Sequence, residues 1–410
     1  MAETERPSPD RHRRRLGLVV VVAVVLVGIA LIGSRLGNRS EPLTSIAPSA
    51  TSVGSPPTSG GSPPTTGGPS PTEPAESAGV SSAPASASLG YLVLPADLAD
   101  RASKAAQGIE PWQSAQQGLL SDVDAALNGT PNPEIDLDIP GTVGPFVDDT
   151  ASAYGLALAY AVTGDERYAT KARSYIMAWT STTTRLLNVC QDNGGCHTSL
   201  IVGRVVAGFV FAADLIRPSG VMSTDDDAAF RAWLHDLILP SLSRRINNWG
   251  DTGDFSRAVI TDYLGDRAGF DAALADWKTK MDLVAPDGHI PEEVRRGKAG
   301  ISYTQEALQY KIGVARLAEL RGVDLWSYVG AQGGSLDKAI NVLRRYWFDR
   351  AAWPWNTNVK IPSPGPMWEI AYQHFQDPAW PRVFAEDRPF GLNAHSAIRW
   401  TTLTNGIAIP

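Results

Sequence analysis

The sequence predicts an all-α protein: one large domain of antiparallel helix pairs, preceded by a single transmembrane helix and a disordered linker. Three features of the chain lead to this prediction. An uninterrupted apolar run lies near the N-terminus, a long segment rich in Ser, Pro, Thr and Gly follows it, and apolar residues then recur with helical spacing. The helical part, residues 90–410, is long enough to bury a full hydrophobic core.

The first 33 residues combine positive charge with an apolar run. Residues 16–33 form a stretch of 18 apolar or small residues, which is long enough to cross a bilayer as a helix. Four arginines between residues 11 and 15 precede the stretch. This excess of positive charge predicts a cytoplasmic tail over residues 1–15, a single-pass cell-membrane anchor over residues 16–33 and an extracellular location for the rest. A cleaved signal peptide is the alternative, although no small-x-small cleavage site directly follows the run.

Residues 34–89 are predicted to be a linker. The segment consists mainly of Ser, Pro, Thr, Gly and Ala and contains almost no large apolar side chain. Such a composition cannot bury enough apolar surface to offset the loss of chain entropy on folding, so we expect disorder. About 50 flexible residues would let the following domain reach a polymer some distance from the membrane.

The charge of the chain is not that of a nucleic-acid-binding protein. It has 36 Lys and Arg against 43 Asp and Glu, which gives a net charge of −7. We therefore expect no nucleic-acid partner, and an anionic substrate has to be met by a local basic patch rather than by the overall field. The domain is expected to be monomeric.

Short Gly-Asp turns divide the domain into helices. Apolar-periodic helices are predicted to end at Gly164 and Gly265, where glycine can adopt the left-handed conformation, and Asp165 and Asp266 are predicted to cap the helices that follow. Another helix is expected to end at Gly322. Repeated helix–turn–helix units predict stacked antiparallel pairs, which in about 300 residues usually curl into a toroid or solenoid. An irregular helical bundle is the alternative.

The chain has two cysteines, Cys190 and Cys196, in the sequence CQDNGGC. A disulfide that closes this short loop is plausible in an oxidising compartment, which agrees with an extracellular domain. Two free thiols are the alternative. His197 alone does not complete a four-ligand set, so no metal is expected, and no cofactor is expected either.

A basic loop and a tyrosine stand together in EEVRRGKAGISYTQEALQY, residues 292–310. Ser302 and Gln305 fit the capping-box pattern, which places Tyr303 in the first turn of a helix. The helix N-terminus and the nearby arginines, Arg295 and Arg296, would favour the anionic form of the tyrosine. A tyrosine of this kind can take a proton from carbon and then donate it to a leaving oxygen. The alternative is a half-buried aromatic residue beside a solvated loop.

A second polar stretch, SRRINNWGDTGDF, carries Asn247 and Asn248 between two predicted helices. Paired amides can hydrogen-bond a carboxylate and stabilise the charge that moves onto it. β-Elimination from a uronic acid needs this, because removal of the C5 proton places charge on the neighbouring carboxylate.

These stretches resemble the alginate lyase family of polysaccharide lyases. VDDTASAYGLALAYAVTGDERYATKARSYIMAW, NNWGDTGDF, YLGDRAGFDAAL, APDGHIPEEVRR and GVDLW occur in the order expected of that family, and the similarity spans roughly residues 110–400. The resemblance implies an α/α toroid, an incomplete barrel of antiparallel helix pairs, with a groove for an acidic polysaccharide. It also implies β-elimination with Tyr303 as base and acid, Arg296 tuning it and Asn248 neutralising the carboxylate.

The chain departs from the family at one position. The alginate-cleaving members read Asn-Asn-His, whereas this chain has Trp249 after the two asparagines. A tryptophan cannot neutralise a carboxylate or act as a base, although it can stack on a sugar, and this puts alginate in doubt as the substrate. His289 is a candidate for an imidazole from elsewhere. Together with Asn247, Trp249 and Arg295 it completes the expected substrate-binding set.

Other interpretations remain open from the sequence. A catalytically silent module that binds an anionic cell-surface glycan would also fit the change at Trp249. Glu292 and Glu293 would be the acid and base of a hydrolase, but adjacent residues rarely face each other across a bond. Residues 351–372, rich in proline and aromatic residues, are either a groove-lining loop or a plain connector. The many tryptophans belong to a sugar groove or to a helical core.

Overall fold

Helices make up most of the folded chain in the computed structural model, which describes residues 87–190, 196–356, 358–392 and 395–410. The expected tail, anchor and nearly all of the expected linker lie outside the described residues. The α-helices of the described part are α1 Pro95–Ala106, α2 Trp112–Asn128, α3 Pro145–Thr163, α4 Glu166–Thr182, α5 His197–Val205, α6 Ala207–Leu215, α7 Thr224–Trp233, α8 Leu239–Ser241, α9 Asn248–Leu264, α10 Arg267–Met281, α11 Pro291–Val294, α12 Gly300–Leu320, α13 Leu336–Phe348, α14 Met367–Phe375, α15 Pro381–Phe384 and α16 Thr401–Thr404.

Shorter elements connect some of these helices. Strands β1 (Asp136–Leu137) and β2 (Arg185–Leu186) form a parallel pair, with Asp136 opposite Arg185. Single turns of other helix types are η1 Arg217–Ser219, η2 Leu234–Ile238, η3 Gly297–Ala299, η4 Arg350–Ala352 and η5 Ala385–Asp387. The prediction of an all-α domain is therefore confirmed for the described residues.

The two Gly-Asp turns end and start helices as predicted. Gly164 and Gly265 adopt left-handed φ angles of +73° and +72° at the ends of α3 and α9. Asp165 then caps α4 by accepting a hydrogen bond from the backbone N–H of Arg167, and Asp266 caps α10 in the same way. Each turn reverses the chain within two residues, so α3 and α4 form one antiparallel pair and α9 and α10 form another.

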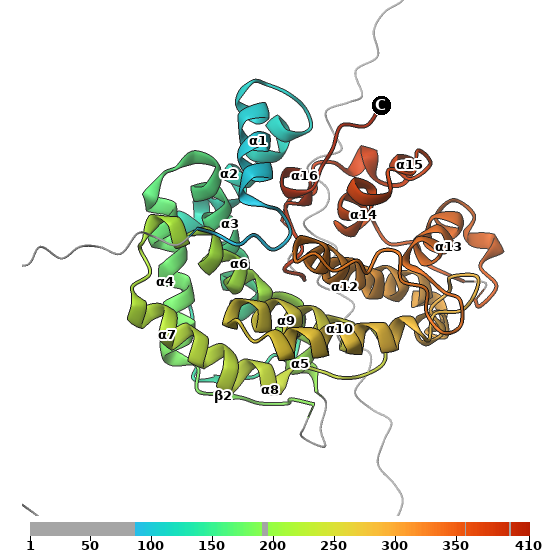
Figure 1. Ribbon diagram of the computed structural model, residues 1–410, viewed down its shortest axis with the longest axis horizontal. Helices are drawn as coiled ribbons and strands as arrows, with labels where there is room; N and C mark the ends of the chain where they lie inside the picture. Colours follow the sequence, from blue (N-terminus) through green and yellow to red (C-terminus); the bar gives the residue numbers. More distant parts are fainter. Residues whose placement is uncertain (1–86, 191–195, 357, 393–394) are drawn as a thin grey trace, which may run out of the picture. The chain divides into compact units, whose positions relative to one another are not determined.

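Helices that follow each other in the chain also pack on each other. Helix α3 contacts α2, α4 and α6, while α9 contacts α5, α10 and α12. Figure 1 shows α9 and α10 side by side, with α12 next to them. The last helix, α16, contacts α1 and α2, and the Trp112 indole N–H donates a hydrogen bond to the carbonyl oxygen of Gly406 across 3.1 Å. Helix α9 consequently lies between α5 on one side and α12 on the other, and both contribute to the site.

Most of the tryptophans belong to the hydrophobic core. The fully buried ones are Trp179, Trp277, Trp368, Trp380 and Trp400. A second long apolar segment, residues 197–219 with α5 and α6, has the length and hydropathy of a membrane span, but nine-tenths of it is buried inside the domain. Burial on all sides explains its uniform apolar character, and we assign it to the core.

Candidate active site

The two asparagines lie at the start of α9 and have different roles. Asn247 is the N-cap, and its side-chain oxygen accepts a hydrogen bond from the backbone N–H of Trp249 at 3.2 Å. Asn248 is the first residue of the helix and is completely buried. Both polar atoms of the Asn248 side chain lack a hydrogen-bond partner among the described residues. Because an unpaired buried amide is costly, Asn248 is a candidate for binding a ligand.

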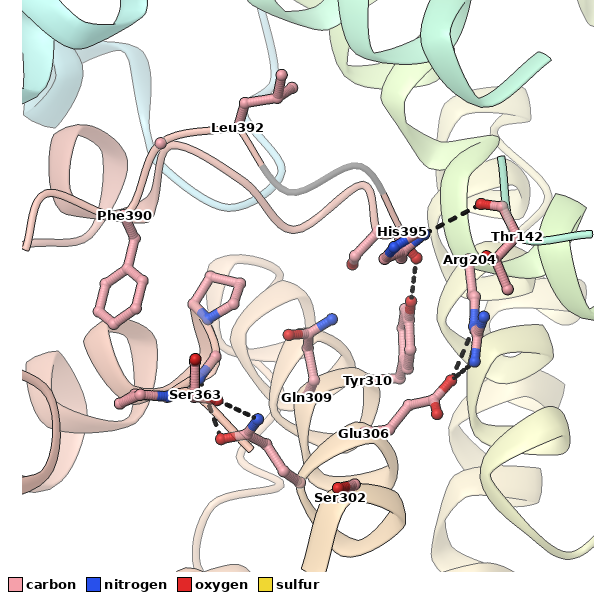
Figure 2. Close-up of a pocket in the computed structure, with 16 residues that line it drawn as sticks. Thr142, Arg204, Ser302, Glu306, Gln309, Tyr310, Ser363, Phe390, Leu392 and His395 are labelled. Carbon is pink, nitrogen blue, oxygen red and sulfur yellow. Dashed lines mark hydrogen bonds and ion pairs between the residues drawn. The ribbon is translucent and has the colours of Figure 1, made fainter. Parts of the chain in front are cut away.

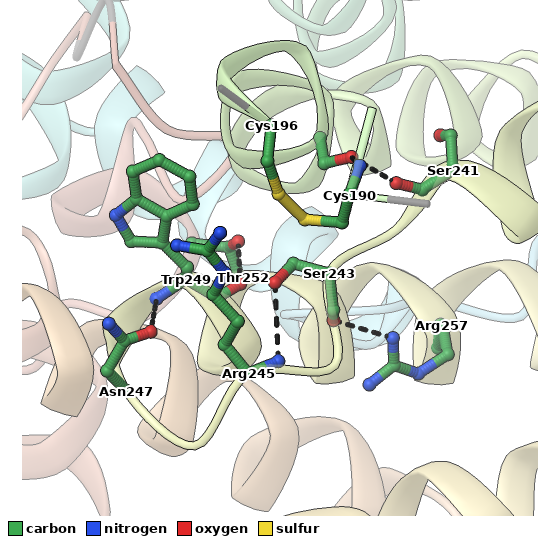
Figure 3. The surroundings of a disulfide bond; sticks show 10 residues. Cys190, Cys196, Ser241, Ser243, Arg245, Asn247, Trp249, Thr252 and Arg257 are labelled. Carbon is green, nitrogen blue, oxygen red and sulfur yellow. Dashed lines mark hydrogen bonds between the residues drawn. A yellow bond between two sulfur atoms is a disulfide. The ribbon is translucent and has the colours of Figure 1, made fainter. Parts of the chain in front are cut away.

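Two glycines bring the preceding loop directly against α9. A Cβ atom at Gly250 would lie 1.5 Å from the carbonyl oxygen of Arg245, and one at Gly253 would lie 2.0 Å from that of Ser243. Only glycine permits this approach of backbone to backbone. The contact holds Arg245 next to the first turn of the helix, where its guanidinium lies 4.7 Å from the centre of a Trp249 ring (Figure 3).

An imidazole lies on another side of Trp249. The rings of His197 and Trp249 meet edge to face, with centroids 6.3 Å apart. The Nδ1 atom of His197 is 2.7 Å from the carbonyl oxygen of Ile139. Because a carbonyl oxygen can only accept, Nδ1 carries a proton and donates this hydrogen bond, in which Nε2 takes no part. His197 follows Cys196, which forms a disulfide with Cys190 (Figure 3).

The basic loop places a cation beside the phenol of Tyr303. The Arg296 guanidinium lies over the face of the ring, 4.0 Å from its centroid. Tyr303 is half-buried in the first turn of α12, as predicted. The guanidinium and the phenol ring therefore form a cation–π contact at the start of the helix.

The expected cap of this helix was wrong. Helix α12 starts at Gly300 with Ala299 as N-cap, and Ser302 lies inside the first turn. The turn η3 runs straight into the helix and removes the need for a side-chain cap. Gln305, the other half of the expected capping box, accepts a hydrogen bond from the Gly365 N–H and donates one to the Ser363 carbonyl oxygen, each at 3.0 Å. A tertiary contact has therefore replaced the local one.

A buried carboxyl group, Glu293, connects the asparagine to the arginine. One of its oxygens accepts a hydrogen bond from the backbone N–H of Asn248 at 2.7 Å, and the other has no partner in the described part of the chain. Burial raises the pKa of Glu293 to about 7, although the Asn248 hydrogen bond and the charge of Arg296 act in the opposite direction. Glu293 was considered from the sequence only as a hydrolase residue, because its contact with α9 depends on the tertiary fold.

In the first two turns of α9, buried charges are paired. Asp251 bonds Lys311 of α12 at 2.8 Å, and Asp254 bonds Lys280 of α10 at 2.5 Å and also Arg257. Burial raises the pKa of Asp251 to about 6, while the charge of Lys311 opposes the rise. These pairs connect α9 with α10 and α12 and fix the position of the helix that carries Asn248.

Two of the expected substrate-binding residues have other contacts. The Nδ1 atom of His289 is 2.6 Å from a carboxylate oxygen of Asp287, and its ring packs against Trp355 with the two planes tilted by 46°. Arg295 is exposed and forms an ion pair with Glu292. Among the described residues, neither side chain forms a hydrogen bond or ion pair with Asn248 or Tyr303.

A pocket of about 590 Å³ opens beside this group of residues (Figure 2). Its floor is the face of α12 that carries Ser302, Glu306 and Gln309, and one wall is the segment 363–366. This wall belongs to the Pro-rich stretch 351–372 for which a groove-lining role was one of two interpretations, and the contact favours that role.

Comparison with known proteins relates this chain to polysaccharide-degrading enzymes. A family model described as alginate lyase matches residues 101–353. A protein named polysaccharide lyase from Stenotrophomonas maltophilia (strain K279a) is 27% identical over 180 residues, which cover 41% of this chain and 52% of the relative. The chain thus spans about half the length of the curated relative that it matches.

Solved structures share the fold. Alginate lyase A1-III from Sphingomonas species A1 superposes with a TM-score of 0.64 at 17% identity, covering 79% of this chain and 97% of that one. An alginate lyase from Bacteroides ovatus gives 0.61 at 18% identity, covering 78% of this chain and all of the other. A tyrosine-to-phenylalanine variant of alginate lyase A1-III, complexed with tetrasaccharide, gives 0.61 at 16% identity and covers 79% of this chain and 97% of that one.

Proposed function

The chain belongs to the alginate lyase family, and from this premise we propose that it is a polysaccharide lyase that cleaves a uronic-acid-containing polysaccharide by β-elimination. One observation carries the proposal. Tyr303, with Arg296 on its ring face, lies at the start of a helix, and the buried side chain of Asn248 has both polar atoms unpaired. Glu293 links the two parts, because its carboxylate accepts a hydrogen bond from the backbone N–H of Asn248 and its carbonyl oxygen accepts one from the backbone N–H of Arg296.

Each residue has a defined task in the proposed reaction. Asn248 donates hydrogen bonds to the uronate carboxylate and stabilises the charge that develops when the C5–H bond breaks. Tyr303, reacting as its phenolate with the Arg296 guanidinium over its ring, accepts the C5 proton. The C4–O4 bond then breaks, a double bond forms between C4 and C5, and the leaving oxygen takes the proton back from Tyr303. The products are a new chain end and an unsaturated uronate.

Trp249 restricts the stereochemistry that the site can support. An elimination in which the proton and the leaving oxygen lie on the same face of the sugar needs only Tyr303. Elimination with a base on the opposite face needs another proton acceptor, and the indole of Trp249 cannot serve. We propose that Tyr303 acts as both base and acid, with Trp249 and Arg245 contacting the sugar.

A simple assay tests the proposal. The full-length chain, purified in mild detergent, is incubated with polymannuronate, polyguluronate, hyaluronan, heparan sulfate and glucuronan, and the ultraviolet absorbance of the unsaturated uronate is followed. We expect an increase with at least one polymer and its loss, by a factor of about 10²–10⁴, in Tyr303→Phe. Tyr168→Phe, a half-buried tyrosine on α4, is the matched control and should keep its activity.

The alternative, a silent binding module for an anionic glycan, predicts a different result. Such a protein would bind one of these polymers, measured by calorimetry, without any increase in absorbance. Its binding would also be unaffected by Tyr303→Phe, which retains the ring and removes only the hydroxyl group.

We also propose that the enzyme is held at the cell membrane by residues 16–33, with its domain outside. The support comes from the length of the apolar run and the arginines before it. If this is correct, the full-length chain stays in the membrane pellet after alkaline extraction, and protease added to intact cells degrades the domain. Release of the chain into the supernatant would contradict the anchor.

A further inference from the structure

We propose that the pocket beside Tyr303 is a subsite for an uncharged sugar, so that the substrate is a polysaccharide in which uronate alternates with neutral sugar units. This inference rests on the proposed lyase function and specifies its substrate class. It is drawn from the distribution of charge on the two sides of the tyrosine.

The pocket lies directly beside the proposed reacting group. Ser302, which lines it, precedes Tyr303, and Glu306 lies one helical turn further along the same side of α12. Arg204 of α5 lines the opposite wall of the pocket. A sugar in this pocket would therefore be a neighbour of the uronate that reacts at Tyr303.

The pocket's own charges cancel. The Arg204 guanidinium bonds the Glu306 carboxylate, with Nε to Oε1 at 2.7 Å, and both side chains are mostly buried (Figure 2). The other described lining groups carry no permanent charge, among them Gln305, Gln309 and Ser363. A sugar carboxylate in this pocket would meet a carboxylate and a guanidinium that is already paired, whereas hydroxyl and amide groups match the available donors and acceptors.

The other side of Tyr303 is cationic. Arg296 lies on the phenol ring and Arg245 on Trp249, next to the unpaired amide of Asn248. Among the described residues, neither arginine has an ion-pair partner. Binding of a sugar carboxylate is therefore favoured at the reacting position, and binding of a second carboxylate in the pocket is disfavoured. A homopolymer of uronates would place a carboxylate in both, while an alternating polymer places one carboxylate only at the reacting position.

Substrate comparison tests the inference. Hyaluronan and unsulfated chondroitin alternate glucuronate with an uncharged N-acetylhexosamine, and glucuronan is a glucuronate homopolymer; all three are linked through O4 of glucuronate. With fragments of matched length and the full-length chain, we expect kcat/KM for at least one alternating polymer to exceed that for glucuronan by about 10-fold or more. Polymannuronate serves as the second homopolymer.

A charge change in the pocket sharpens the test. Glu306→Gln leaves the Arg204 guanidinium without its partner, so it can bind a carboxylate, and the preference for the alternating polymer should fall about 10-fold. Glu166→Gln, at an exposed position on α4, makes the same change in net charge and should leave the ratio unchanged. If Glu306→Gln does not fold, Ser302→Lys adds a cation at the pocket while keeping the Arg204–Glu306 pair, and the ratio should shift in the same direction.

The outcomes separate the inference from the function. An alternating polymer that is preferred by the wild type, with a preference that falls in the pocket variant, supports the inference. A homopolymer cleaved as well as or better than the alternating polymers, or a ratio that neither variant changes, overturns it and leaves the lyase function intact. Failure to cleave any polymer overturns the proposed function, and this inference with it.

Discussion

The beginning of α9 is buried, and it holds two kinds of polar side chain. Asp251 in the first turn and Asp254 in the next are paired with lysines from two neighbouring helices. The first residue of the helix, Asn248, is just as deeply buried, and its side chain has no partner among the described residues. The paired carboxylate of Asp251 and the unpaired amide of Asn248 are thus about one helical turn apart.

This difference distinguishes scaffold from site. A buried charge that is fully paired holds helices in register, and removal of its partner leaves an uncompensated charge. A buried amide without a partner costs folding free energy, and a ligand that supplies the missing hydrogen bonds recovers it. We therefore expect substitutions that break the pairs of Asp251 and Asp254 to change stability, and substitutions of Asn248 to change activity.

The largest expected effect on stability concerns the ion pair between Asp251 and Lys311. Lys311→Met leaves the carboxylate of Asp251 buried without its partner, and the free energy of unfolding at neutral pH should fall by about 3–5 kcal/mol. Urea unfolding followed by circular dichroism measures the change. Lys360→Met, at an exposed position, is the control. A loss for Lys311→Met no greater than that of the control would contradict the assignment of this pair to the scaffold.

Asn248 should show the reverse pattern. Asn248→Ala removes no hydrogen bond that its side chain makes within the described protein, so the free energy of unfolding should change by less than about 1 kcal/mol. It does remove the donor to the substrate carboxylate, and kcat should fall by about 10²–10³. Unfolding curves and the absorbance assay on the same preparation measure both quantities.

The neighbouring residue provides a direct contrast. Asn247→Ala removes a helix cap, which should cost about 1 kcal/mol of stability. A larger loss of stability in Asn248→Ala than in Asn247→Ala would show that Asn248 is a structural residue after all.

A pH-dependent effect is expected at Glu293, whose carboxylate accepts a hydrogen bond from the backbone at the start of α9. Its pKa is raised from 4.5 to about 7, so the folded state holds this proton more tightly than the unfolded state. Stability from this group is therefore greatest below pH 4.5, falls as pH rises towards about 7 and is constant above. Glu293→Gln removes the titration, and its stability relative to wild type should increase over this range by an amount on the order of 2–3 kcal/mol.

Unfolding experiments at several pH values measure this difference. Glu292→Gln makes the same change in charge at the adjacent residue, where the ion pair with Arg295 is on the surface. A stability difference between Glu293→Gln and wild type that stays constant with pH would mean that the carboxyl group is not buried as described.

Local signals allowed much of the fold to be predicted from the sequence. The turns at Gly164–Asp165 and Gly265–Asp266 need only a residue that tolerates positive φ followed by a capping side chain, and both requirements are visible in the chain itself. The position of Tyr303 in a first helical turn was also predicted correctly, although from the wrong cap. The prediction held because the observed N-cap, Ala299, is only three residues before the expected one, Ser302.

The features that were missed depend on contacts between distant segments. Gln305 bonds residues about 60 positions away instead of completing a capping box. His197 reaches Trp249 from another helix, and Glu293 acquires its raised pKa from burial against α9. The spacing of residues in the sequence does not predict such contacts. For His197 and Glu293 the only signal in the sequence was a titratable residue near a motif, and such residues are too common to identify a site.

The close approach at Gly250 has a consequence for protein engineering. Because the loop at residues 243–245 contacts the helix through its carbonyl oxygens, the position of its backbone does not depend on which side chains the loop carries. The side chain at position 245 can therefore be exchanged while the loop backbone keeps its position. A library that varies residue 245 while keeping Gly250 and Gly253 would sample different sugar contacts over Trp249 without rebuilding the catalytic residues.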